Sequence, residues 1–300
     1  MKKNRRFGFT DMLLLAGIIL PVVVSILLKV MFIPASEGIQ ITGAYIFFTI
    51  PMPMGGLPIT EVQVNSWLVM VSVLFLCLFL TRGLKEKAET KRQIIAEWIV
   101  EKCDNLVEVN MGEFFSGFAP FIAAVLGLSV FSSLMSLFGL FPPTSDINTT
   151  AGWAILVFIL ITHYKLKCGP VHYLKSFGQP AVLLTPLNVI SEFATPLSMA
   201  FRHYGNVLSG SVVSVLVAAG LQAVSVAVFG NLPGILGKIP FFRIGLPAVL
   251  SVYFDLFSGC LQAFIFAMLT MLYVAGAFPA DDYKARKQRR IEKMKKIKNN

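Results

Sequence analysis

The sequence predicts an all-α polytopic membrane protein with about six membrane segments, two of them long tilted helices that form a hairpin. Of its 300 residues, 56% are hydrophobic and 14% are charged, against roughly 25% charged in an ordinary soluble domain. Apolar windows of about 20 residues, long enough to span a bilayer, recur along the chain. The net charge of +10 gathers beside these windows, where topology and lipid headgroups explain it. We therefore expect no nucleic-acid partner.

The first apolar run, residues 12–34, follows the basic segment KKNRR and predicts a retained membrane anchor. A secretory signal peptide also begins with basic residues, but its apolar core is only about 7 to 15 residues long and precedes a small-residue cleavage site. This run is longer and shows no clear site of that kind. A loop rich in Pro and Gly, containing PMPMGGLP, comes next. Residues 1–64 are therefore interpreted as an anchor span and an external loop.

A second apolar run, residues 67–80, ends in the basic connector TRGLKEKAETKR, which the positive-inside rule places in the cytoplasm. The next segment, QIIAEWIVEKCDNLVEV, carries apolar residues on one face of a helix and acidic residues on the other. This pattern predicts an amphipathic helix on the membrane surface, and a helix packed on a soluble partner is the alternative. The apolar face is Ile95, Trp98, Ile99, Cys103, Leu106 and Val107, and the acidic face is Glu97, Glu101, Asp104 and Glu108.

Four further apolar runs complete a predicted membrane domain over residues 65–280. The third run, residues 118–141, leads into PPTSDINTT, which has no Lys or Arg and is expected outside. The fourth, residues 153–161, is short and precedes the lysine-containing segment THYKLKCGPVHYLKSFG, expected inside. The last two, residues 187–229 and 246–278, exceed one perpendicular crossing, which implies strong tilt or a bend.

The chain ends in a basic segment, residues 281–300, that we expect in the cytoplasm. It holds nine Lys or Arg residues between Lys284 and Lys298, against one Glu. Six crossings place both termini in the cytoplasm and bring the three strongest basic connectors to the same side. Lys238 and Arg243 are mild exceptions. The expected location is the plasma membrane, as a multi-pass protein of a bacterial inner or cell membrane.

Arg202 stands in the segment MAFRHYGN, at the edge of a long uncharged run. A cation in hydrocarbon costs from roughly 3 kcal/mol on insertion scales to more than about 10 in simulation. Arginine keeps its charge because its pKa exceeds about 12, so this position needs a partner or a role. Snorkelling to the interface is the structural alternative, and ordinary packing between membrane helices explains the small neighbours. The small and polar residues that share its helical face are Thr195, Ser198, Gly205, Asn206 and Ser209.

Asp255 is the one charged residue of the last apolar run, and Ser258 and Gln262 follow it at helical spacing. We expect these three side chains to line one water-accessible stripe. A buried carboxylate that water reaches takes up and releases protons. A structural ion pair with Arg202 is the alternative. Glu192, ten residues before the arginine, belongs either to a second polar access path or to the membrane interface.

The sequence offers no constellation for covalent chemistry. No set of Ser, His and Asp, no metal-ligand spacing and no phosphate-binding Gly loop stands out. We therefore expect no cofactor and no chemical active site. Ion translocation and a self-contained secondary transporter or channel, with Arg202 binding an anion, are the two functions that remain.

Two segments, PLNVISEFATPLSMAFRHYGN and LQAFIFAMLTMLYVAGAF, closely resemble the best-marked parts of subunit a of F-type ATP synthases. LFGLFPPTSDINTT and YKLKCG are weaker matches, and together these segments extend over residues 65–278 in the expected order. The resemblance implies a stator subunit beside a rotating ring of c subunits, with two offset half-channels for protons or Na⁺. It also implies contact with the subunit b peripheral stalk, the remaining synthase subunits and the lipid bilayer.

The resemblance assigns roles to individual residues. In the family, the arginine that matches Arg202 faces the ring carboxylates, helps them release their ion and blocks leakage between the half-channels. The small residues around it let the ring helices approach. The residues expected in ion translocation are Arg202, Asp255, Gln262, Asn206, Glu192, Ser211 and His203.

Three positions depart from the family pattern. His203 and Tyr204 replace the Leu and Phe that are common after the arginine. Ser211 stands where many relatives carry Glu or His, so a relay in the outer half-channel would depend more heavily on Asp255. The choice between H⁺ and Na⁺ is not readable, because it depends mainly on the c subunit.

Overall fold

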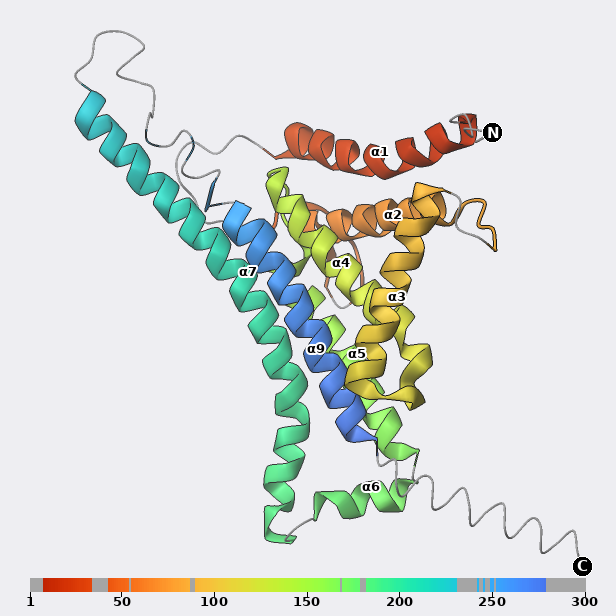
Figure 1. Ribbon diagram of the computed structural model, residues 1–300. Coiled ribbons are helices and arrows are strands. Elements are labelled where there is room, and N and C mark those ends of the chain that lie inside the picture. The colour runs from red at the N-terminus through yellow and green to blue at the C-terminus, as the bar shows by residue number, and fades with distance from the viewer. Residues whose placement is uncertain are drawn as a thin grey trace, which may run out of the picture.

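The computed structural model shows a predominantly helical chain (Figure 1). It describes residues 8–33, 43–53, 55–86, 90–167, 169–178, 182–230, 242, 245, 249–250 and 252–278. The expected basic tail, residues 281–300, and most of the connector between the last two long helices lie outside the described residues.

Within the described part of the chain, six helices are long and apolar enough to cross a membrane, which confirms the predicted number and the all-α class. Two of them begin with a segment of different helical type. The spans are α1 (Phe9–Phe32), α2 (Glu61–Thr81), η1 (Glu113–Phe118) with α4 (Ala119–Leu137), α5 (Ile147–Leu166), α7 (Thr185–Phe229), and the π-helix η6 (Val252–Ser258) with α9 (Gly259–Ala277).

Shorter elements join these spans, and several were not predicted. An antiparallel pair of strands forms in the loop rich in Pro and Gly that follows the first span, and a short helix follows the fourth span. The shorter elements are β1 (Ile46–Ile50), β2 (Leu57–Thr60), α3 (Lys91–Met111), η2 (Pro143–Ser145), α6 (Pro170–Phe177) and η3 (Val182–Leu184).

Helix α5 is longer than the apolar run of residues 153–161 that predicted it. It covers 20 residues, because polar residues at both ends continue the helical backbone. The Asp146 carboxylate accepts a hydrogen bond from the Asn148 backbone N–H at 2.8 Å and so caps the first turn. Hydropathy therefore located this span but underestimated its length.

Helices α1 and α2 lie side by side and run across one end of the remaining bundle (Figure 1). A cluster at their charged ends joins them to α3. Asp11 of α1 is buried, accepts a hydrogen bond from Arg92 Nη1 at 2.8 Å and lies 3.5 Å from Arg82 Nη1. Further along the pair, the Ser72 hydroxyl donates to the Ile18 carbonyl at 3.2 Å. These polar contacts fix the N-terminal span to the rest of the chain.

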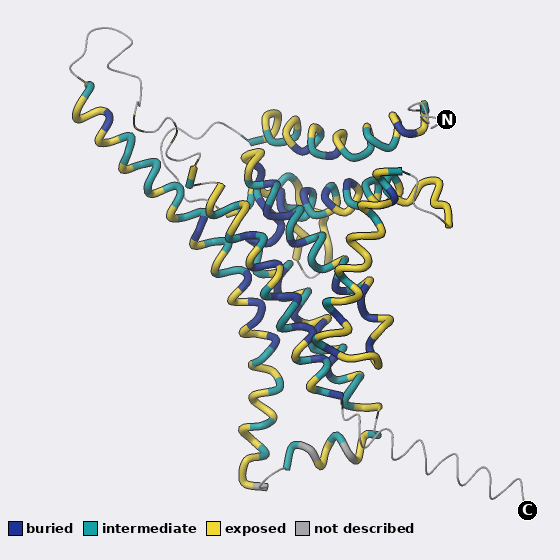
Figure 2. Tube along the Cα trace, in the orientation of Figure 1, coloured by how far each residue is buried: buried dark blue, intermediate teal, exposed yellow. Residues whose placement is uncertain are grey.

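The core of the bundle lies between α3, α4, α5 and α9, where Phe115, Ile122, Val157 and Phe266 are buried. Figure 2 shows the buried residues gathered along α9. The most apolar window of the η6–α9 span has 39% of its residues buried, whereas that of α7 has 6%. Helix α9 is thus central, and α7 packs against it at the edge with much of its surface uncovered.

Helices α7 and α9 form the predicted hairpin. Asn206 is hydrogen-bonded to Gln262, and Gly210 lies against Phe254, so higher numbers on one helix meet lower numbers on the other, as antiparallel helices require. The 45 residues of α7 extend for about 67 Å at 1.5 Å per residue, roughly twice the thickness of the hydrocarbon core. Such a helix fits within the hydrocarbon core when it is strongly tilted or bent.

Helix α3 is the predicted amphipathic helix. Its C-terminal half packs on α4 and α9 through Leu106, Val107 and Met111. Its N-terminal half leaves Ile95 and Trp98 half exposed. The apolar face is therefore only partly covered by the protein itself, as expected of a helix that rests on the membrane surface.

Close packing between α4 and α9 depends on one glycine. A Cβ atom added at Gly259 would lie 2.5 Å from both Cβ and Oγ of Ser133, and this Cβ cannot move without its backbone. The two helices approach this closely because residue 259 has no side chain.

We expect Gly259→Ala to lower the thermal unfolding midpoint of the purified protein in detergent, because overpacking costs about 1–3 kcal/mol. Gly276→Ala is the matched control in the same helix, since nothing lies within 4 Å of an added Cβ there. Thermal unfolding of the two variants, measured side by side, provides the comparison. Equal midpoints would contradict the close contact.

Candidate functional site

The polar face predicted around Arg202 lies on the uncovered side of α7. Ser198, Arg202, Asn206 and Ser209 are exposed, and Thr195 and Gly205 are half-buried. The hydroxyls are turned back onto their own helix: Thr195 donates to the Ser191 carbonyl at 2.9 Å and Ser209 to the Asn206 carbonyl at 3.1 Å. Nothing lies within 4 Å of a Cβ added at Gly205. This open face is therefore exposed and polar, and the side chains around Arg202 are short.

Arg202 makes no hydrogen bond or ion pair with any residue that the structure describes. The guanidinium projects from a helix that is apolar enough to cross a membrane, and its charge is permanent. Its electrostatic cost in lipid is thus not offset by a described residue of the chain. A counter-charge must come from outside this part of the protein.

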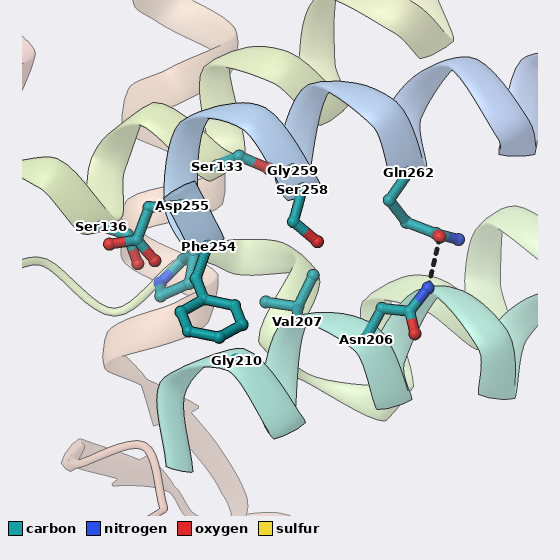
Figure 3. A pocket seen from close by; sticks show the side chains of 11 residues that line it. Ser133, Ser136, Asn206, Val207, Gly210, Phe254, Asp255, Ser258, Gly259 and Gln262 are labelled. Carbon is teal, nitrogen blue, oxygen red and sulfur yellow. Dashed lines mark hydrogen bonds between the residues drawn. The ribbon is translucent and has the colours of Figure 1, made fainter. Parts of the chain in front are cut away.

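One amide of α9 reaches the face of α7. Asn206 Nδ2 donates a hydrogen bond to Gln262 Oε1 at 2.6 Å, a link between residues that are 56 positions apart (Figure 3). Gln262 is buried, whereas Asn206 is exposed one turn beyond Arg202. The bond therefore connects the interior of the hairpin to its outer polar face.

A narrow cavity of about 10 Å³, enough for roughly one water molecule, continues from this bond into the hairpin. Asp255, Ser258 and Gln262 all line it, as the predicted polar stripe requires. Figure 3 shows Asp255 at one end of the cavity and the Asn206–Gln262 bond at the other. Asp255 belongs to the π-helix η6, a local irregularity that is frequent at functional sites.

Two serines of α4 form a further wall that the sequence analysis missed. Ser133 and Ser136 line the cavity together with Asp255 and Pro142. With Ser129 they recur at intervals of four and three residues, so they occupy one helical face. That spacing within an apolar run was the available sequence signal. It does not reveal which helix the serines face.

His203 follows Arg202 in α7, so its side chain points about 100° around the helix from the arginine, into the interior rather than onto the open face. It is 1% exposed and packs edge-to-face against Trp153 of α5 and Phe266 of α9. Its Nε2 lies 3.4 Å from the Ser129 hydroxyl of α4, and Nδ1 has no hydrogen-bond partner among the described residues. The side chain does not line the cavity. Its predicted part in ion translocation stays a prediction.

Glu192 belongs to a separate polar cluster near the start of α7. Lys165 Nζ of α5 donates to Glu192 Oε2 at 2.8 Å, and the Tyr173 hydroxyl of α6 donates to Oε1 at 3.1 Å. Burial and the neighbouring carboxylate raise the pKa of Tyr173, so this hydroxyl remains a donor. Ten residues of helix separate Glu192 from Arg202, a distance of about 15 Å along the axis.

The predicted site residues thus fall into five places. Arg202 and Asn206 lie on the open face, and Asp255 and Gln262 lie at the cavity. Glu192 lies in its own cluster, and His203 lies in the four-helix interior. Ser211 is half-buried away from the cavity, and its hydroxyl donates to the Leu208 carbonyl at 2.8 Å.

Known proteins are similar to this chain over most of its length. Residues 63–275 match the family model of the ATP synthase A chain. The chain is 32% identical to an ATP synthase subunit a of Desulforamulus reducens over 216 residues, 71% of this chain and 77% of the relative. It is 32% identical to one of Bacillus pumilus over 224 residues, 68% and 86% of the two chains.

A third relative carries a more specific name. The chain is 28% identical over 255 residues to "ATP synthase subunit a, sodium ion specific" of Propionigenium modestum, covering 79% of this chain and 81% of the relative. The family match spans the helices that carry Arg202, the cavity and the Glu192 cluster, and it covers well over half of the sequence. The chain belongs to the ATP synthase A chain family.

Proposed function

We propose that this chain carries H⁺ or Na⁺ across the membrane by presenting Arg202 to the carboxylates of a rotating c-subunit ring. As a member of its family, the chain has a stator role in ion translocation by the ATP synthase membrane sector. The observation that carries the more specific proposal is the open face of α7, on which a permanent charge has no partner among the described residues.

A ring of helices that carry carboxylates would match the charge and the shape of that face. A buried or lipid-facing cation is stabilised by an opposite charge within about 4–6 Å, and a second membrane helix comes that close only where side chains are small. Ser198, Gly205 and Ser209 supply such a surface around Arg202. A passing ring helix would offer its carboxylate to the guanidinium and lose its bound ion there.

The cavity supports an outer half-channel that ends beside the arginine. Asp255 lines one end of the cavity, and the hydrogen bond between Asn206 and Gln262 lies at the other end. In this proposal Asn206 faces the ring. In this proposal Asp255 receives the ion from the external side, and the two amides pass it to a ring carboxylate. The Glu192 cluster is the corresponding access path from the cytoplasm, and both termini are cytoplasmic.

Family membership does not favour the rival function, a self-contained transporter or channel in which Arg202 binds an anion. The two functions differ in their need for a partner. The purified chain alone in liposomes should move neither ions nor small anions, because its path ends at the missing ring. Solute transport by the isolated chain would support the rival. The peripheral stalk subunit b is a further proposed partner.

The coupling ion is either H⁺ or Na⁺. One relative is named as sodium ion specific, and the resemblance places the choice mainly in the c subunit. ATP synthesis by the assembled complex, driven by an imposed Na⁺ gradient or by an imposed pH gradient, distinguishes the two.

Contact with the ring is tested directly by cysteine cross-linking. A Cys substituted at Ser198 or Ser209, on either side of Arg202, should form a disulfide with a Cys in the middle of a c-subunit helix. A Cys at Gly276, in α9 away from this face, is the control. Cross-linking only from the control position would contradict the proposed geometry.

We expect Arg202→Ala to abolish ion-driven ATP synthesis while the assembled complex remains detectable, because the exposed side chain supplies charge rather than core packing. ATP synthesis by membrane vesicles, normalised to the amount of this chain by immunodetection, measures the effect. Phe201→Ala removes the neighbouring exposed side chain without changing charge and should retain most of the activity. Normal synthesis by Arg202→Ala would falsify the mechanism.

We expect Asp255→Asn to slow ion translocation several-fold, because an amide cannot take up and release a proton or bind Na⁺ with a full charge. Asp146→Asn is the matched control: it makes the same change in a residue that caps a helix, and Asn caps equally well. Passive ion flux through the membrane sector is the measurement. If both variants conduct at the same rate, Asp255 is not in the path.

A further inference from the structure

His203 occupies the junction of four helices, immediately after the arginine. Its ring is 99% buried, lies between Trp153 and Phe266, and reaches past them to Ser129 of α4. Helix α7 otherwise packs mainly against α5 and α9. The contact between Nε2 and the Ser129 hydroxyl therefore links α7 to a helix that it touches little elsewhere.

The chemistry of this position is unusual for a packing residue. An aliphatic side chain would fill a space between two aromatic rings without leaving a polar atom unpaired, whereas Nδ1 of His203 has no partner among the described residues. The hydrogen bond of the other ring nitrogen therefore offsets only part of the cost of burying the polar imidazole. Unlike an aliphatic side chain, the imidazole makes a hydrogen bond, and this bond requires one orientation of the ring.

The orientation of His203 determines that of Arg202, because successive residues of an α-helix are rotated by about 100° around the helix axis. When His203 is held inward toward α4, Arg202 is held on the exposed side. The Asn206–Gln262 bond ties α7 to α9 one turn further along. Two directional bonds to two different helices fix the rotation of α7 about its own axis more firmly than apolar contacts, which tolerate sliding.

We infer that His203 is a positioning residue: its bond to Ser129 sets the rotation of α7 that directs Arg202 toward the c-subunit ring. This inference rests on the proposed function. It gives His203 no ion-carrying step, since the side chain does not line the cavity and is buried in the interior rather than exposed on the open face.

The test compares His203→Leu, His203→Gln and Ser129→Ala in the assembled ATP synthase. Leu fills the space without a hydrogen bond, Gln restores a side chain that bonds to a hydroxyl, and Ala at 129 removes only the partner. Ser132→Ala is the matched control, because Ser132 is equally buried in α4 and does not contact His203 through a hydrogen bond.

Two readouts separate positioning from general stability. The first is ATP synthesised per assembled complex, which should fall about fivefold in His203→Leu and in Ser129→Ala, the loss expected for one hydrogen bond. The double variant should fall no further, since both changes remove the same bond. His203→Gln and Ser132→Ala should stay near the unmodified protein.

The second readout is the pattern of disulfide cross-links to the ring. In His203→Leu the yield from a Cys at Ser198 should fall and that from a Cys at the neighbouring Leu197 should rise, because α7 has rotated. An unchanged pattern together with unchanged synthesis per complex overturns the inference. If His203→Leu fails to assemble, the smaller Ser129→Ala change decides the question by the same two readouts.

Arg202→Ala is included as a reference that separates the two hypotheses. Continued synthesis by this variant would refute the proposed function itself. Loss of synthesis in Arg202→Ala, with wild-type behaviour of Ser129→Ala and His203→Leu, would leave the proposed function intact and refute only the role of His203.

Discussion

The central physical constraint on this protein is the positive charge of Arg202, which no described residue of the chain neutralises. Arg202 lies on a helix long and apolar enough for the membrane and makes no ion pair with a described residue. Two other charged groups of the membrane-spanning helices are paired: Asp11 contacts two arginines, and Glu192 contacts Lys165. The contrast is informative, because an arginine in lipid without a counter-ion is too costly to be incidental. The missing carboxylate is best supplied by another subunit.

The hairpin of α7 and α9 makes that exposure compatible with a stable fold. Helix α9 supplies the buried core, so α7 can remain at the edge with one side uncovered. Two specific contacts help to hold the helices around this hairpin. Gly259 allows α4 to approach, and the Asn206–Gln262 bond closes one end of the cavity. A more extensive apolar contact would stabilise α7 better and would cover the face that a ring reaches in the proposed mechanism.

The sequence predicted the parts of this arrangement that are encoded locally. Six apolar runs, the amphipathic α3 and the polar face around Arg202 follow from composition and from spacing along one helix, and the structure agrees with them. Contacts between distant segments were not predictable in the same way. Ser133 lies against Gly259, and Ser129 lies against His203. Both contacts depend on how α4 packs, which no spacing within α4 specifies. The roles of these residues in translocation remain predictions.

The length of α7 is the feature that connects this geometry to rotation. Glu192 lies about 15 Å along the axis on one side of Arg202, and Gly210, at the level of Asp255 in the partner helix, lies about 12 Å on the other. If α7 stood upright, both access paths would meet the ring at the same place on its circumference, one above the other. Because α7 is too long to stand upright, its tilt separates the levels of Glu192 and Gly210 along the plane of the membrane. In the proposed mechanism an ion that enters by one path must then travel with the ring to reach the other, and Arg202 between them prevents the shorter route.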